Sequence, residues 1–151
     1  MSATNLAPWT ATELWFTMNS LVRDQAVESR ARINERIDMP FSRFRALRRL
    51  AMHDMTQRDL ARRLGVDAPA MSGIIHDLAD RGLVTRRTLE TDARCKLVTI
   101  TDAGLATVRA VADDQSSAPP MFAALDDDQR ARLGELLDVL RAAAEREVAD
   151  V

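Results

Sequence analysis

Residue types that build catalytic or metal sites are scarce in this chain of 151 residues. Cys95 is the single cysteine, and His53 and His76 are the two histidines. One cysteine rules out a disulfide framework, and together these counts argue against a zinc site. The five glycines lie at least eight residues apart, a spacing that cannot form a phosphate-binding loop or a dinucleotide-binding turn. We therefore expect no enzyme, no metal and no cofactor.

The charged side chains are unevenly distributed along the chain. Residues 1–40 carry four basic and five acidic side chains, residues 41–100 carry twelve and seven, and residues 101–151 carry five and eleven. The net charge of −2 thus hides a middle segment of net +5 between acidic ends. Such a middle suits a module that binds a polyanion. Arginines that only solubilise helix faces would give the same totals, so charge alone leaves both interpretations open.

The elements that would present these charges are mostly helices. Apolar residues recur at helical intervals from Thr10 to Asp38, and Thr10 and Glu13 have the spacing of a capping box. The pattern predicts one helix of roughly 25 residues, which is too long to bury its apolar stripe against one small core. We expect this helix to extend between subunits and to end before Pro40.

Three shorter helices should follow. They are expected at Ser42–Met52, at Thr56–Gly65 and from the N-cap Asp67 to Gly82, where the glycines supply the stops. The last two helices are joined by a glycine-containing turn, which is the helix-turn-helix pattern. Many unrelated helical hairpins share that pattern, so the segments that come next decide the interpretation.

Two β-prone segments follow the helix-turn-helix. Leu83–Arg87 and Lys96–Ile100 mix polar and apolar residues, and Thr88–Cys95 between them is a polar tip. A helix-turn-helix followed directly by a hairpin is a winged helix. Helices should then resume at Thr101, break at the proline pair 119–120, and end with a helix that Asp126 caps.

The predicted fold is mainly α with a small antiparallel β wing. It combines a winged helix-turn-helix with a lobe formed by the helices on either side of it.

Several motifs resemble the MarR family of bacterial regulators. TQRDLARRLGVD, from residue 56, is similar to the family's third helix, and LADRGLVTRR, from residue 78, to the junction of its recognition helix and wing. DARCKLVTITDAG, from residue 92, reproduces the wing pattern Asp-x-Arg, three residues, Val-x-Leu/Ile-Thr-x-x-Gly. The resemblance implies a homodimer that binds pseudo-palindromic double-stranded DNA, commonly to repress, and that small ligands or oxidants release. It further implies a helical dimerisation lobe beside the winged helix-turn-helix. The corresponding domains are an N-terminal dimerisation helix at residues 1–39, a DNA-binding lobe at residues 40–100, and C-terminal dimerisation helices at residues 101–151.

The recognition helix of this resemblance supplies the first candidate DNA contacts. Ser72 would reach the DNA backbone, Gly73 would let a phosphate approach closely, and His76 would donate to a base edge. Family members often have hydroxyl residues where this chain has Pro69 and Ala70, whose apolar groups would touch thymine methyls or contribute shape. The outward face as a whole is expected to carry Ala70, Ser72, Gly73, His76 and Asp77.

The wing supplies the second group of candidate contacts. Arg94 suits a narrow minor groove, where negative potential is enhanced. In the resemblance Asp92 pairs with Arg94 and aims it; an ordinary turn aspartate is the alternative. Arg86 and Arg87 alternate along a strand, so only one of them should meet DNA. Further phosphate contacts are expected from Lys96 and, at a helix N-terminus, from Thr56 and Gln57.

A small ligand and an oxidant are the two kinds of effector expected for such a regulator. The resemblance places a ligand pocket where the first, second and fifth helices meet, with candidate lining residues Trp15, Phe16, Met18, Val22, Phe44 and Arg48. An aromatic and methionine stripe is more often core or dimer interface than pocket. Arg94 and Lys96 beside Cys95 would favour its thiolate and hence a redox switch on the wing, but a passive small residue in a strand is the favoured interpretation.

The function expected from these observations is that of a homodimeric, sequence-specific DNA-binding regulator. It would repress pseudo-palindromic operators until a small molecule releases it. The alternative is a winged-helix protein-interaction module without tight DNA binding, which the residues at Pro69 and Ala70 keep open. The N-terminal residues MSATNLAPWT lack the regions of a signal peptide, and no apolar stretch reaches the roughly 18 residues of a membrane span. We therefore expect a cytoplasmic protein with no membrane partner.

Overall fold

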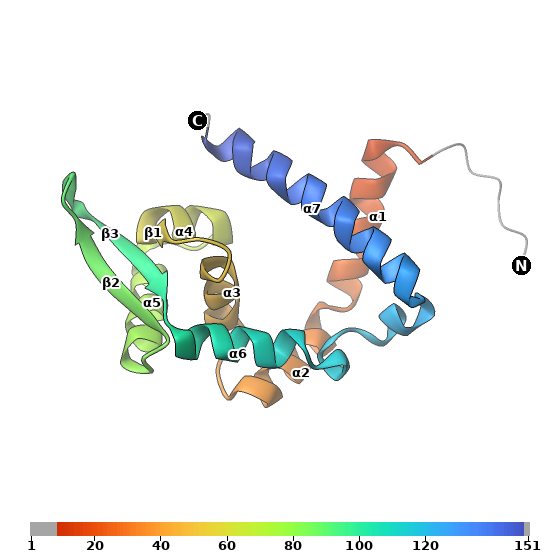
Figure 1. The fold of residues 1–151 in the computed structure, drawn as a ribbon, viewed down its shortest axis with the longest axis horizontal. Helices are drawn as coiled ribbons and strands as arrows, with labels where there is room; N and C mark the ends of the chain where they lie inside the picture. The colour runs from red at the N-terminus through yellow and green to blue at the C-terminus, as the bar shows by residue number, and fades with distance from the viewer. Residues whose placement is uncertain (1–8, 150–151) are drawn as a thin grey trace, which may run out of the picture. The chain divides into compact units, whose positions relative to one another are not determined.

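The computed structural model describes the backbone of residues 9–149 and the side chains of residues 9–91 and 95–147. Figure 1 shows the order of the elements along the chain. The chain forms two compact units, at residues 1–117 and 118–151. Within the described part, the structure contains no helix whose length and apolar character would let it span a membrane.

The N-terminal arm is made of two helices, α1 (Ala11–Asp24) and α2 (Ala26–Ile37). The capping box at the start of α1 is confirmed, because Thr10 Oγ1 accepts from the N–H of Glu13 at 3.2 Å and Glu13 Oε2 accepts from the N–H of Thr10 at 3.5 Å. The prediction of one continuous helix is wrong. Gln25 interrupts it with ψ of −2°, and since neither proline nor glycine lies there, the sequence carries no signal for the break.

Helices α3 (Phe41–Leu50), α4 (Gln57–Leu64) and α5 (Ala68–Asp80) form the centre of the first unit. Thr56 caps α4 by accepting from the N–H of Asp59 at 3.1 Å, and Gly65 ends it with a positive φ of 65°. Asp67 caps α5 by accepting from the N–H of Ala70 at 2.7 Å. The predicted helix-turn-helix is thus confirmed, with the capping residues that the sequence indicated.

The sheet has three antiparallel strands in the order β1-β3-β2: β1 (Met55–Thr56), β2 (Val84–Leu89) and β3 (Asp92–Ile100). The wing is the β2–β3 hairpin. The prediction of a polar tip over Thr88–Cys95 is wrong, because Thr88 pairs with Lys96 and Leu89 with Asp92 across a register shift. Backbone hydrogen bonds between strands do not require apolar side chains, so the pairing continues through a polar sequence.

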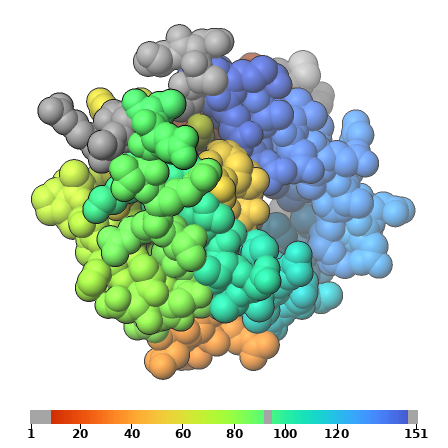
Figure 2. Space-filling view, turned by 60° about the vertical axis from the view of Figure 1, so that its left-hand side comes forward, coloured from red at the N-terminus to blue at the C-terminus, as the bar shows by residue number. Residues whose placement is uncertain are grey.

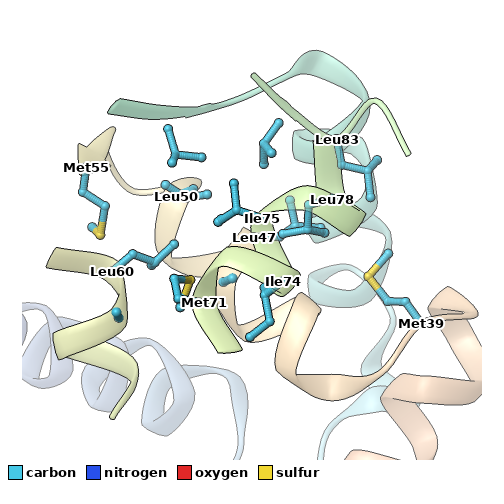
Figure 3. Packing of buried hydrophobic residues seen from close by; sticks show 14 residues of the cluster. Met39, Leu47, Leu50, Met55, Leu60, Met71, Ile74, Ile75, Leu78 and Leu83 are labelled. Carbon is cyan, nitrogen blue, oxygen red and sulfur yellow. The ribbon is translucent and has the colours of Figure 1, made fainter. Parts of the chain in front are cut away.

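The core lies where α3, α4 and α5 meet the sheet. Its fully buried side chains come from all three helices and from the central strand (Figure 3); they are Leu47, Leu50, Leu60, Met71, Ile75, Leu78 and Val98. Most of these residues are aliphatic and pack at helical spacing, as the sequence predicted. The wing and α5 are therefore supported by one core.

Helix α6 (Asp102–Ala112) follows the wing, and the turn η1 (Gln115–Ser117) completes the first unit. The second unit contains the turn η2 (Pro120–Ala124) and the helix α7 (Asp127–Ala149). The predicted capping box of α7 is confirmed, since the N–H of Gln129 donates to Asp126 Oδ1 at 2.8 Å and the N–H of Asp126 to Gln129 Oε1 at 3.0 Å. The helix before the prolines ends at Ala112, earlier than the proline pair.

Candidate nucleic-acid interface

Helix α5 presents a strip of small and polar side chains to solvent. Pro69, Ala70, Ser72, Gly73 and His76 are all exposed, whereas the opposite side of the helix is buried. Figure 2 shows α5 and β2, in yellow-green and green, at the surface of the molecule. The buried side chains that fix the rotation of α5 about its own axis are Met71, Ile74, Ile75 and Leu78. The recognition-helix residues predicted for DNA contact thus share one accessible face.

His76 does not stand alone on this face. Its Nε2 lies 3.2 Å from Asp80 Oδ2, one helical turn further along, and both side chains are 66% exposed. Asp80 was not predicted as a partner of His76, although their i, i+4 spacing on a helix favours such a pair. This contact holds the imidazole on the outward face.

Asp77 is placed differently from its prediction. Instead of pointing outward, its carboxylate accepts from Arg43 Nε of α3 at 3.0 Å and from Arg81 Nε at 3.1 Å. These two hydrogen bonds, with Arg81 the larger influence, lower the pKa of Asp77 below its usual value. The expectation of an outward Asp77 is wrong because its position on the helix lies at the edge of the buried stripe, next to α3.

Residues from α4, α5 and β3, together with Thr56 of β1, line a hollow of about 520 Å³, which we call the α4–α5–β3 hollow. Five of the residues predicted from the sequence as DNA contacts or a redox site lie in its wall: Thr56, Gln57, Ser72, Cys95 and Lys96. The remaining lining residues are Arg58, Ala61, Ala68 and Met71. Arg58 was not among the contacts predicted from the sequence. Its position in the first turn of α4, directly after the predicted contact Gln57, could have indicated it. The hollow combines an apolar wall with two cations.

The hydroxyl of Thr56 has two bonds within the chain. It accepts from the N–H of Asp59 and donates to Asp59 Oδ2 at 2.7 Å. Its side chain is therefore held as a helix cap, and Gln57 beside it is half-buried. The positive end of the α4 dipole is directed to this side of the hollow.

The strand register separates the two wing arginines. Arg86 lies opposite the buried Val98, whereas Arg87 lies opposite Leu97. Cross-strand partners share one face of a sheet, so Arg86 lies on the face that turns toward the helices, and Arg87 on the other face. Lys96, two residues from Val98 along β3, shares the face of Arg86.

Three further wing residues differ in how far the structure describes them. The side chains of Asp92 and Arg94 lie outside the described residues, so their predicted pairing and groove contact remain predictions. Cys95 is half-buried and lies in the wall of the α4–α5–β3 hollow. Its redox role is likewise untested.

The predicted ligand-pocket residues fall into two environments. Phe44 is buried in a small cluster with Ile33 of α2 and Val111 of α6. The residues predicted from the first helix, Trp15, Phe16, Met18 and Val22, are exposed on α1, and Arg48 is exposed on α3. The pocket therefore stays a prediction.

The arrangement of α4, α5 and the β2–β3 wing defines a winged helix-turn-helix protein. Residues 37–94 match the sequence model of the MarR family. This match covers the winged-helix segment and most of the motifs that resemble the family.

Solved structures extend the likeness beyond this segment. A mutant MepR from a multidrug-resistant S. aureus clinical isolate is 18% identical, with a TM-score of 0.76 over 90% of this chain and 99% of that chain. A mutant MarR from E. coli, complexed with operator DNA, is 22% identical, with a TM-score of 0.59 over 87% and 99%. PcaV from Streptomyces coelicolor, in complex with its natural ligand, is 22% identical, with a TM-score of 0.56 over 95% and 99%. At these identities the likeness shows the fold, and the predicted fold class is confirmed.

Proposed function

We propose that this chain is a homodimeric, sequence-specific DNA-binding transcriptional regulator. The observation that carries the proposal is the outward face of α5 beside the α4–α5–β3 hollow, within a segment of net charge +5. A convex helix face with small residues fits a major groove, and the surrounding cations suit phosphates. The E. coli MarR relative, whose structure holds operator DNA, supports the same use of this fold.

In this proposal each part of the interface has its own role. Ser72 and Gly73 lie against the DNA backbone, and His76 reads a base edge, while Pro69 and Ala70 contribute shape or contact thymine methyls. Arg94, aimed by Asp92, enters the minor groove. Arg86 rather than Arg87 is the strand arginine that meets DNA, because it shares the helix-facing side of the wing. Phosphates are also held at Lys96, Thr56 and Gln57.

Two copies are needed for a pseudo-palindromic site. Two-fold symmetry presents two recognition helices about 34 Å apart, which matches successive major grooves on one side of B-DNA. We assign the dimer contacts to the helices at residues 1–39 and 101–151, whose apolar side chains Trp15, Phe16, Leu136 and Leu140 are strongly exposed in the single chain. A regulator of this kind needs no catalytic site, and its DNA target implies a cytoplasmic location.

Repression and release by a ligand complete the proposal. PcaV, a structural relative, holds its natural ligand. The candidate effector residues are those of the predicted pocket, with Cys95 as the alternative entry for an oxidant. Cys95→Ser should leave a peroxide response unchanged if Cys95 is the passive strand residue that the sequence favours.

The proposal is tested by binding to the promoter region next to the protein's own gene. A mobility shift should show a complex whose affinity falls severalfold or more with each doubling of salt, because several phosphate contacts release counterions. Arg94→Ala should weaken binding to every palindrome, His76→Ala should also blur base preference, and Arg86→Ala should cost more than Arg87→Ala. Arg109→Ala on α6, an equal change of charge, is the control.

The outcomes separate the proposed function from its alternative. No complex with any duplex, even in dilute buffer, would leave the protein-interaction module as the better explanation. A complex with a flat salt response would contradict the phosphate contacts assigned to the wing and to α4.

A further inference from the structure

One charged cluster lies between the proposed DNA-reading face and the N-terminal arm. Asp77 of α5 is its centre: Oδ2 accepts from Arg43 Nε at 3.0 Å, and Oδ1 accepts from Arg81 Nε at 3.1 Å. Each carboxylate oxygen thus has its own guanidinium donor, which is the strong, charge-assisted form of hydrogen bond. We call Arg43, Asp77 and Arg81 the Asp77 cluster.

The cluster reaches a third part of the chain through Arg81. Its Nη1 donates to the backbone carbonyl oxygen of Asp38 at 3.3 Å. Asp38 has the left-handed conformation, with φ of 47°, and connects α2 to α3. The Asp77 cluster therefore ties α5 both to α3 and to the corner where the arm enters the lobe.

Apolar packing turns the outward face of α5 to solvent, but it supplies no directional bond. The buried stripe of α5 consists of Met71, Ile74, Ile75 and Leu78, and contacts of this kind are not directional. Asp77 lies at the edge of that stripe, directly after His76 and one turn beyond Gly73. Two directional bonds at this edge resist rotation and sliding of the outward face. The lowered pKa of Asp77 agrees with a carboxylate that both arginines hold.

We infer that Asp77 is a positioning residue for sequence readout, which holds the outward face of α5 in register through Arg43 and Arg81. The inference rests on the proposed function, because it concerns how that function discriminates sequences. It assigns no DNA contact to Asp77 itself.

Simple electrostatics predicts the opposite result when Asp77 is neutralised. Asp77→Asn removes a negative charge near a polyanion and leaves two guanidinium groups without their carboxylate, so binding to any duplex should tighten. If Asp77 positions α5, the same change should weaken binding to the preferred sequence relative to a random one. The ratio of the two affinities therefore distinguishes positioning from charge.

The experiment uses the full chain and a duplex selected from a random library by the wild-type protein, with a shuffled duplex of equal length as reference. We expect Asp77→Asn to lower the ratio of specific to non-specific affinity by about tenfold, a loss in the range of one mismatched base pair. Arg43→Gln changes the charge in the opposite direction and should lower the ratio as well. The double variant should lose no more than Asp77→Asn alone, because Asp77→Asn already removes the contact with Arg43.

Glu28→Gln is the matched control. Glu28 forms an ion pair with Arg32 at 3.7 Å inside α2. The substitution therefore removes one negative charge without breaking a contact between two elements, and the ratio of specific to non-specific affinity should not change. Melting temperature and dimer mass, measured on every variant, identify any that fail to fold, and Arg81→Gln then replaces such a variant.

The outcomes keep the two proposals apart. If the wild-type protein selects no sequence, the proposed function fails and with it this inference. If the wild-type protein discriminates and folded Asp77→Asn keeps the wild-type ratio, the positioning role alone is overturned. A ratio that rises in Asp77→Asn would overturn it too.

Discussion

Gly104 lies where the chain has no room for a side chain. An added Cβ would be 2.3 Å from the carbonyl oxygen of Leu83 and 2.6 Å from Ile100 Cγ1. Thr101 creates this close approach: its N–H donates to Leu83 O at 3.0 Å, and its hydroxyl donates to Gly82 O at 2.7 Å. The Thr-x-x-Gly part of the wing motif thus joins the base of the wing to α6 and is structural rather than a DNA contact.

Replacing this glycine should destabilise the fold. We expect Gly104→Ala to lower the free energy of unfolding by about 2–3 kcal/mol, because a backbone carbonyl cannot move aside as a flexible side chain does. Urea unfolding followed by circular dichroism measures the change. Gly134→Ala is the control: outside the neighbouring residues of its own helix, nothing lies within 4 Å of its added Cβ, and alanine favours a helix by up to about 1 kcal/mol. Equal losses at both positions would show that the approach to Leu83 costs little.

At the scale of single residues, the accessible part of the site was predictable and its supporting contacts were not. Helical spacing alone separated the outward residues of α5 from its buried stripe. The contact between Asp77 and Arg43 could not be predicted, because Arg43 lies 34 residues earlier in the chain and no local spacing relates the two. The same holds for the α4–α5–β3 hollow, whose walls come from separate elements.

At the scale of elements, helix ends were the most predictable features. Thr10, Thr56, Asp67 and Asp126 all cap helices as expected, since capping depends on residues three positions apart. Elements defined by distant partners were missed. Strand β1 has two residues and exists only through its pairing with β3, so nothing local indicates it. The wing strands extended beyond their predicted bounds for the same reason.

The contribution of the N-cap of α5 to stability can be tested directly. Asp67→Ala removes the acceptor for the N–H of Ala70, a bond of 2.7 Å, and should lower the free energy of unfolding by about 1 kcal/mol. Asp67→Ser restores a capping oxygen and should recover most of the loss. Both are measured by urea unfolding. If the serine variant is as unstable as the alanine variant, the bond to Ala70 is not what stabilises the start of α5.

At the scale of the whole molecule, the apolar surface exceeds what one chain covers. Helix α7 carries Leu133, Leu136, Leu137 and Leu140 at helical spacing, and these side chains are 36–55% exposed. Helix α1 adds Trp15 and Phe16, which are more than 60% exposed. Several large apolar side chains exposed on one helix mark an interaction surface. The acidic net charge of residues 101–151 would keep such a surface away from DNA.

A substitution on the leucine stripe of α7 should therefore dissociate the proposed dimer. Leu140→Asp should raise the dissociation constant of the dimer at least about a hundredfold, because each copy loses a buried leucine worth about 2 kcal/mol and must bury a charge instead. Sedimentation equilibrium over a range of protein concentrations measures the constant. Ala142→Asp is the matched control, since residue 142 is exposed and lies on the side of α7 opposite the leucine stripe.

The consequences for DNA binding follow from the same variant. A monomer still has one recognition helix and one wing, so Leu140→Asp should retain weak binding to a half-site and lose the added affinity of the full palindrome. Ala142→Asp should keep that added affinity. A wild-type protein that is monomeric at micromolar concentration would remove the basis for pairing two recognition helices. A Leu140→Asp protein that dimerises as tightly as the wild type would instead locate the dimer contacts away from α7.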